Sequence, residues 1–357
     1  MNRPPLPHRR HVLRGLGATG LLVHSGALSL LAACREGDDT SSHDTGDTSG
    51  HDLLRFAVIT DTHVKADPAS INNQTLLETI AILNARRPPL DLVLMTGDLV
   101  DELPSDEPAY YDEHDDTALH RFEEALAACT VATLPALGNH DYFMAGGGLI
   151  NDLTDDFAAR EALFQARLGM PGPWYRTDIS GIAFYALNTM QPHPDAAWQP
   201  NSCGSFGPEQ VAWLEEQLSD GVPAVLFFHH PLALDNAVSH AVSQVVPFEV
   251  PRAEGGYEKY EDTEYEGWTD PIYAVLERFA GQILAAFVGH GHWFIQDTFG
   301  GFPVMETDSV GNSYQRTETG EGDDAQPMRY HLVTIDLTAG TLAVTNDDLF
   351  SYNADSV

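Results

Sequence analysis

The sequence predicts an α/β fold that ends in an antiparallel hairpin, and two observations support this class. Short apolar runs alternate with amphipathic stretches from residue 53 to residue 288, the pattern of buried strands and covering helices. The tail then carries two strand-like segments, residues 330–336 and 341–345, separated by the turn-like segment Leu337–Gly340. With 43% hydrophobic residues, the chain can bury a sizeable core.

The apolar runs are rich in Val, Ile, Leu and Phe, and we expect each to form a buried strand. They cover residues 53–60, 91–96, 131–137, 182–188, 224–228 and 283–288. The stretches between them predict helices over residues 70–86, 117–128, 155–168, 208–218 and 271–279. Pro208 directly after Gly207 is a favourable helix start.

The first 33 residues predict an export signal. Arg9 and Arg10 precede an apolar stretch without acidic residues, and residues 8–14 resemble a twin-arginine signal. Residues 31–34, Leu-Ala-Ala-Cys, resemble a bacterial lipobox, which implies cleavage before Cys34 and lipidation of its thiol. We therefore expect an exported lipoprotein anchored to the membrane of the bacterial cell envelope. The alternative is an ordinary cleaved signal with an incidental cysteine.

Residues 34–52 are small, polar and acidic, and they predict a flexible tether. The formal net charge of −35 argues against a nucleic-acid partner, which needs a basic surface. Three cysteines exclude a disulfide scaffold and a cysteine-based zinc site. Cys129 and Cys203 are either buried thiols or a pair formed outside the cytoplasm. The sequence leaves the oligomeric state open.

Polar clusters follow five of the predicted strands, at the sheet edge where α/β folds build their sites. They are Asp61-Thr62-His63, Gly97-Asp98-Leu99-Val100-Asp101, Gly138-Asn139-His140-Asp141, His229-His230-Pro231 and Gly289-His290-Gly291-His292. Taken singly, each cluster is read more readily as an ordinary turn or a satisfied histidine. The third and fifth clusters give a stronger signal, because glycines beside the possible ligands let the backbone approach closely. Together they gather carboxylates whose burial calls for cations. Imidazole, carboxylate and amide donors without thiolate suit Mn, Fe, Zn, Ni or Co, and their number fits two ions.

In this order, the five clusters resemble the motifs of the calcineurin-like metallophosphoesterases, over residues 56–311. The resemblance implies a four-layer sandwich of two mixed β-sheets flanked by helices, in a domain spanning residues 53–357. It places a dinuclear metal site at the C-terminal ends of the strands. One ion is then held by Asp61, His63, Asp98 and His292. Asp98 bridges to a second ion, which Asn139, His229 and His290 complete.

The same resemblance implies hydrolysis of a small phosphate mono- or diester by in-line attack of a metal-bridging hydroxide. His140 is then the general acid toward the leaving group, and Asp101 is the matching candidate to orient His140 and keep it protonated. His230 is expected to support the site by packing. The alternative is a catalytically inactive metal-binding lipoprotein with a substrate-binding or structural role.

Departures from the family pattern narrow the choice among the branches of the metallophosphoesterase family. Glu102-Leu103 replaces the Arg-Gly of serine/threonine protein phosphatases, and no tyrosine follows Asp98 at the spacing of purple acid phosphatases. Bacterial phosphomonoesterases and phosphodiesterases remain, and the acidity mildly favours a monoanionic diester. The insertions 102–116 and 236–273 are either walls of a substrate pocket or solvated acidic loops. The second insertion carries Tyr257, Tyr260, Tyr265 and Trp268.

Overall fold

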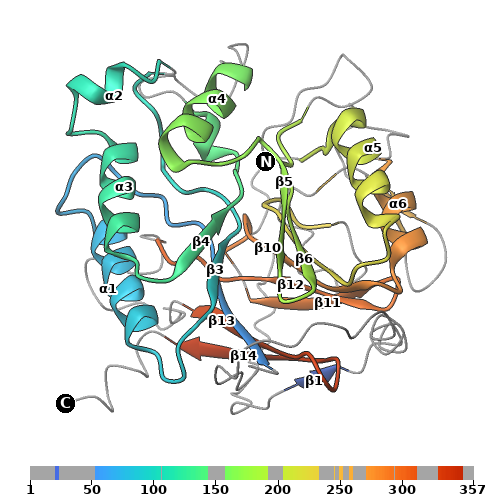
Figure 1. Cartoon of the computed structure of the whole chain (residues 1–357). Helices are drawn as coiled ribbons and strands as arrows, with labels where there is room; N and C mark the ends of the chain where they lie inside the picture. Colours follow the sequence, from blue (N-terminus) through green and yellow to red (C-terminus); the bar gives the residue numbers. More distant parts are fainter. Residues whose placement is uncertain are drawn as a thin grey trace, which may run out of the picture.

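A computed structural model of the chain shows two packed β-sheets with helices on their outer faces (Figure 1). It describes residues 21–23, 53–105, 107–143, 157–191, 204–232, 245, 249–251, 257–259, 271–292, 294–311 and 329–348. Cys34, the tether, Cys203 and most of the insertion 236–273 lie outside these residues. In the described part of the chain, no helix combines the length and the apolar character needed to cross a membrane.

The first sheet has the order β1-β14-β13-β2-β3-β4. Strands β2 (Leu53–Ile59), β3 (Leu92–Met95) and β4 (Ala132–Pro135) run parallel, so their C-terminal ends share one edge. The tail hairpin of β13 (Arg329–Asp336) and β14 (Thr341–Asp348) forms as predicted, and β13 pairs antiparallel to β2.

Strand β1 (Leu21–Val23) lies within the expected export signal and pairs antiparallel to β14. The sequence predicts no fold element in this segment, and the structure differs by these three residues. Strand β14 is otherwise an edge of the sheet, whose unpaired main-chain groups accept an extended segment. Cleavage before Cys34 would remove this short strand and leave the other strands of the sheet in place.

The second sheet has the order β11-β12-β10-β7-β6-β5. Its inner strands are parallel: β12 (Phe302–Glu306), β10 (Ile283–Val288), β7 (Ala224–Phe227) and β6 (Ile182–Ala186). The edge strands β5 (Tyr175–Ile179) and β11 (Ile295–Phe299) are antiparallel to their neighbours. The sequence analysis did not predict β5, β11 or β12. A separate small hairpin joins β8 (Glu249–Pro251) to β9 (Tyr257–Lys259).

The helices form where the amphipathic stretches predict them. Helices α1 (Ile71–Ala85) and α3 (Ala118–Ala128) lie on the first sheet, and α5 (Gly207–Leu218) and α6 (Ile272–Phe279) lie on the second (Figure 1). The N-caps are Ser70, which accepts from the N–H of Asn72, and Thr117, which accepts from that of His120. Helix α4 (Phe157–Leu168) and the short helices α2 (Tyr110–Glu113) and η3 (His140–Tyr142) complete the set in the described residues.

The main core lies between the sheets. Phe56 of β2 packs edge-on against Phe184 of β6 and Phe287 of β10, with ring centroids 5.4 and 5.9 Å apart. A second apolar cluster, which includes Leu214 and Leu276, fills the space between the second sheet and helices α5 and α6. The predicted four-layer sandwich of two mixed sheets is therefore confirmed.

The insertion 102–116 packs against the domain. Its Tyr111 is buried, and the hydroxyl donates to the carbonyl of Ser105. Arg167 of α4 donates two hydrogen bonds to Glu123 of α3 and one to Asp112 of α2. This shared arginine ties three helices together, so the segment that follows Asp101 is held in place.

Candidate metal centre

The loops after β2, β3, β4, β7 and β10 converge at one edge of the two sheets and bring all seven predicted ligands together. Main-chain hydrogen bonds fix the loops to one another. The N–H of Asp61 donates to Gly97, and the N–H of Gly289 donates to His229. His229 joins the two sheets, because its Nδ1 lies 3.1 Å from the carbonyl oxygen of Thr96.

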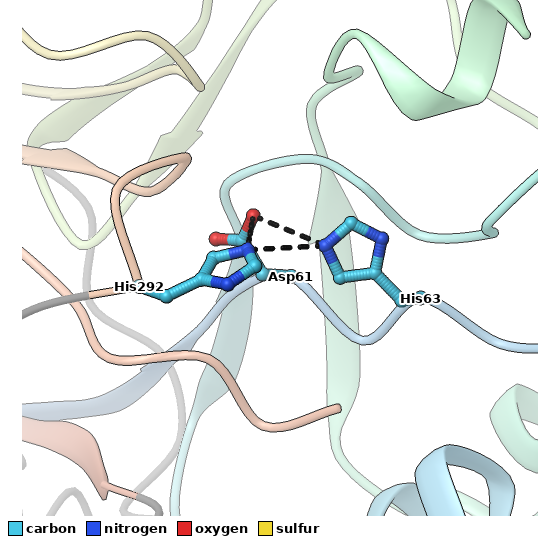
Figure 2. Close-up of side chains that lie close together, drawn as sticks. All are labelled: Asp61, His63 and His292. Atoms are coloured by element: carbon cyan, nitrogen blue, oxygen red, sulfur yellow. Dashed lines mark hydrogen bonds and ion pairs between the residues drawn. The ribbon is translucent and has the colours of Figure 1, made fainter. Parts of the chain in front are cut away.

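Asp61, His63 and His292 form the first donor cluster (Figure 2). Asp61 Oδ1 lies 3.0 Å from His292 Nε2 and 3.6 Å from His63 Nε2. The two Nε2 atoms are 3.1 Å apart. Asp61 is fully buried, and its other oxygen accepts from the hydroxyl of Thr60 and the N–H of His290. One carboxylate oxygen and two ring nitrogens therefore face a common point.

Asn139, His229 and His290 form the second cluster. Asn139 Oδ1 lies 2.9 Å from His229 Nε2 and 3.0 Å from His290 Nδ1. The two ring nitrogens are 3.2 Å apart. The ring of the buried His230 packs against that of His290, with centroids 4.4 Å apart, and His230 Nδ1 lies 2.7 Å from the hydroxyl of Thr189. His230 therefore supports a proposed ligand from behind.

Asp98 lies between the two clusters. Its Oδ2 is 3.6 Å from His63 Nε2 in the first cluster, and its Oδ1 is 3.2 Å from His229 Nε2 in the second. The side chain is nearly inaccessible to solvent. A single carboxylate thus presents one oxygen to each group of donors.

The donor set fits a pair of cations. In both clusters, ring nitrogens approach one another, and a carboxylate is buried beside them without an arginine or lysine contact in the described residues. Cations satisfy both features, since they take lone pairs from imidazole, carboxylate and amide groups at once. These residues include no thiolate donor, which suits the expected Mn, Fe, Zn, Ni or Co.

A family model for calcineurin-like phosphoesterases matches residues 54–294. The chain belongs to this family. Its members are metal-dependent, and the two donor clusters of this chain lie within the matched residues. None of the curated proteins compared with it matches its sequence.

Solved structures similar to this chain share little sequence with it. The purple acid phosphatase PPD1 from yellow lupin (Lupinus luteus) is 16% identical with a TM-score of 0.48, and 84% of this chain and 52% of that chain are covered. GAP50 of Plasmodium is 13% identical with a TM-score of 0.46, with 79% and 81% covered. PhoD is 15% identical with a TM-score of 0.43, with 79% and 63% covered. The chain spans about half the length of the lupin protein.

The charged groups of the metal-donor clusters shift one another's pKa values. Burial raises the pKa of Asp61, but the charge of His292 and the hydrogen bonds from His292 and His63 together outweigh it and hold that pKa well below its usual value. Burial lowers the pKa of His63, but Asp101 and Asp61 raise it to about 10. Burial likewise lowers the pKa of His229, but the neighbouring Asp98 raises it to about 9. Burial and the charge of His229 lower the pKa of His290 to about 3. Without a cation, His63 and His229 are thus the protonated partners of the carboxylates.

His140 lies at the rim, with its ring edge-on to His63 and tilted against Phe143. Its Nδ1 lies 3.0 Å from the main-chain carbonyl oxygen of Asp101 and 3.6 Å from the Asp101 carboxylate. Burial lowers the pKa of His140 despite the nearby Asp98. Both the main-chain carbonyl and the carboxylate of Asp101 therefore face Nδ1 of His140, and both favour the protonated ring against the effect of burial.

The ligand loops adopt an uncommon backbone conformation. Asp61, His63, Asp98, His290 and His292 all have positive φ, between 41° and 74°. Such conformations cost energy for most residues and gather at functional sites. Glycines make room for the close approach: a Cβ at Gly289 would lie 2.6 Å from Asp61 Oδ2, and one at Gly97 would lie 2.7 Å from His229 Nδ1.

Several supporting residues were missed from the sequence. Asn72 of α1 donates to the carbonyl of His63, and Asn73 binds both the N–H and the carbonyl of Lys65. Ser309 donates to the carbonyl of Asp61. The run of polar residues 306–309 after an apolar strand is the signal that marks this last loop.

Proposed function

We propose that the chain hydrolyses phosphate esters with two bound cations. Asp61, His63 and His292 would hold one ion, and Asn139, His229 and His290 would hold the other. Asp98 would bind both. The observation that carries this proposal is the placement of the two Asp98 oxygens, 3.6 Å from His63 and 3.2 Å from His229. When bound, the pair of ions supplies the positive charge that activates water and neutralises the phosphate.

The chain's own residues position the substrate and move a proton. Asn139 is a neutral donor, so it preserves the positive charge of the centre for an anionic phosphate. The Asp101 carbonyl holds Nδ1 of His140 and leaves Nε2 for the leaving oxygen. The incoming phosphate charge favours protonated His140, which then donates this proton as the ester bond breaks.

The substrate is proposed to be a small mono- or diester. The net charge of −35 disfavours substrates of high negative charge, so a monoanionic diester is preferred over a dianionic monoester. The test compares p-nitrophenyl phosphate with bis(p-nitrophenyl) phosphate on the full-length chain, with its metal content measured in parallel. Turnover of neither ester by protein carrying two ions would contradict the proposal and favour the inactive metal-binding lipoprotein.

We further propose that the protein is exported and anchored through a lipid on Cys34. The lipobox-like residues 31–34 and the acidic stretch that follows support this placement. Fractionation of cells that express the Cys34→Ala variant provides the test. Release from the membrane fraction is expected, because several acyl chains would be lost at about 0.8 kcal/mol per buried methylene. Unchanged fractionation would contradict the anchor.

A further inference from the structure

Asp141 is a buried carboxylate that the proposed mechanism leaves without a role. It follows His140 on the loop after β4, and its side chain is fully shielded from solvent. Its Oδ1 accepts hydrogen bonds from the N–H groups of Leu99 and Val100, at 2.9 and 3.0 Å. Its Oδ2 accepts from the N–H of Gly138 at 2.8 Å. All three donors are main-chain groups of the two loops that carry Asp98 and Asn139.

The contact between these loops is reciprocal. The Asp98 carboxylate accepts from the N–H of His140 at 2.8 Å, on the loop that carries Asp141. The Asp141 carboxylate accepts from the two N–H groups that directly follow Asp98. Each loop therefore gives one carboxylate to the main chain of the other, and together these three hydrogen bonds fix the separation of the loops, while the bond from Gly138 holds Asp141 within its own loop.

The two loops also approach each other closely at Gly138. A Cβ at Gly138 would collide with Asp98 Oδ1, so the loops touch through their main chains. Three N–H donors also require two acceptor oxygens. An amide at position 141 would offer one oxygen and turn an NH₂ group toward an N–H donor. A carboxylate is the side chain that satisfies all three.

We propose that Asp141 is a positioning residue that sets the distance between Asp98 and Asn139, and hence the affinity for the second cation. This inference rests on the proposed pair of cations. Asp141 contacts neither the proposed substrate nor any proposed ligand side chain within hydrogen-bond distance. Its effect passes through the main chain of Leu99, Val100 and Gly138. The first cluster has its own supports, from Thr60, Asn72 and Ser309.

The experiment titrates metal-free full-length protein with Mn²⁺ by calorimetry and compares the wild type with the Asp141→Asn and Asp141→Ser variants. In both variants, the affinity of the second binding step is expected to fall about 10–100-fold, with the first step within about threefold of wild type. The electron paramagnetic resonance spectrum should change in parallel, from that of a spin-coupled Mn²⁺ pair to that of a single ion. Asp178→Asn is the matched control, since its exposed carboxylate pairs with Arg176 away from the loops.

The outcomes separate the inference from the function on which it rests. Wild-type protein that binds a single ion would overturn the proposed pair of cations. Wild-type protein that binds two ions, with variants that keep both affinities, would overturn the role of Asp141 alone. Equal weakening of both steps would also overturn it, because general destabilisation does not distinguish the two clusters. The serine variant covers the case in which the asparagine variant does not fold, since its hydroxyl accepts a hydrogen bond without presenting NH₂.

Discussion

Lys65 and Asp101 form an ion pair at the rim of the metal centre, with Lys65 Nζ 3.3 Å from Asp101 Oδ2. The other carboxylate oxygen lies 3.6 Å from Nδ1 of both His63 and His140. Lys65 is one of two lysines in the chain, and Asn73 clamps its main chain on both sides. The pair therefore links the outer surface of the loop to a proposed ligand and to the proposed general acid.

Loss of this ion pair should have a small effect on turnover. Both side chains are about one third to two fifths exposed, so solvent screens the pair and its contribution stays below about 1 kcal/mol. We expect Lys65→Met to lower kcat less than about fivefold, and Lys65→Arg to retain it. Steady-state kinetics at low and high salt provide the measurement. A loss of several orders of magnitude would show that Lys65 contacts the substrate directly.

Asp98 and His140 should differ in what their removal costs. Asp98→Ala removes the oxygens that face both clusters, so bound metal and activity are expected to be lost together. His140→Ala should keep its metal and lose about 10²–10⁴-fold in rate, most for esters with poor leaving groups. Metal analysis and kinetics on matched esters separate the two cases. Equal metal loss in both variants would contradict the assigned roles.

Metal binding should release protons, and its affinity should rise with pH. The pKa values of His63 and His229 are raised to about 10 and about 9, so in the absence of metal both rings are positively charged near pH 7, with both ring nitrogens protonated. Ligation requires the neutral ring, so each proton must leave. At higher pH less work is needed to remove them, and the affinity increases from pH 6.5 to 8.5. Calorimetry in buffers of different ionisation enthalpy counts the protons, and a pH-independent affinity would contradict this assignment.

Gly289→Ala should damage the centre, whereas Gly281→Ala should not. A Cβ at Gly289 would lie 2.6 Å from Asp61 Oδ2 and still closer to the hydroxyl of Thr60. A Cβ at Gly281 meets no atom within 4 Å. We expect the first variant to lose about 1–3 kcal/mol of unfolding free energy and to bind metal more weakly. Chemical denaturation and metal titration test both variants, and similar behaviour of the two would refute the proposed close packing.

Cys129 should react slowly as a free thiol. It forms no disulfide within the described part of the chain, which does not include Cys34 or Cys203. Burial raises its pKa, and its thiol donates to the carbonyl of Val131. In a Cys34→Ser/Cys203→Ser variant, alkylation by iodoacetamide should therefore become half-maximal at a higher pH in the folded protein than in urea. A disulfide between Cys129 and Cys203, found by mass spectrometry of the exported wild-type protein, would contradict the free thiol.

The sequence was sufficient for the parts of the fold that carry a strong side-chain pattern. The predicted strands β3, β6, β7 and β10 are buried along their whole length, so they are continuous apolar runs. Ser70 and Thr117 mark two helix starts. The edge strand β11 alternates partly buried residues with the exposed Gln296 and Thr298, and β12 contains Pro303. Both features weaken a strand prediction, and neither strand was predicted.

In the candidate site too, features that depend on side-chain type could be predicted, and features that depend on main-chain groups could not. Adjacent donors such as Asp61 and His63 made the five loops recognisable, and the parallel strands bring them together. The contact of the Asp101 carbonyl with His140 was not predictable, because every residue has a carbonyl. The hydrogen bonds of Asp141 join residues about 40 positions apart in the chain, and the main-chain donors have no signature in the sequence.

The positive φ angles of the five proposed ligands restrict these positions in a second way. Aspartate and histidine are among the few side chains, with asparagine and glycine, that tolerate this conformation. Backbone geometry and metal coordination therefore favour the same few residue types at these positions. A descendant of this protein that had stopped binding ions would still lose folding stability if valine or isoleucine stood at these positions, because β-branched residues are strained at positive φ. The sequence motif can therefore persist in such a lineage after metal binding is lost. Measured metal content is then better evidence of an active enzyme than the motif alone.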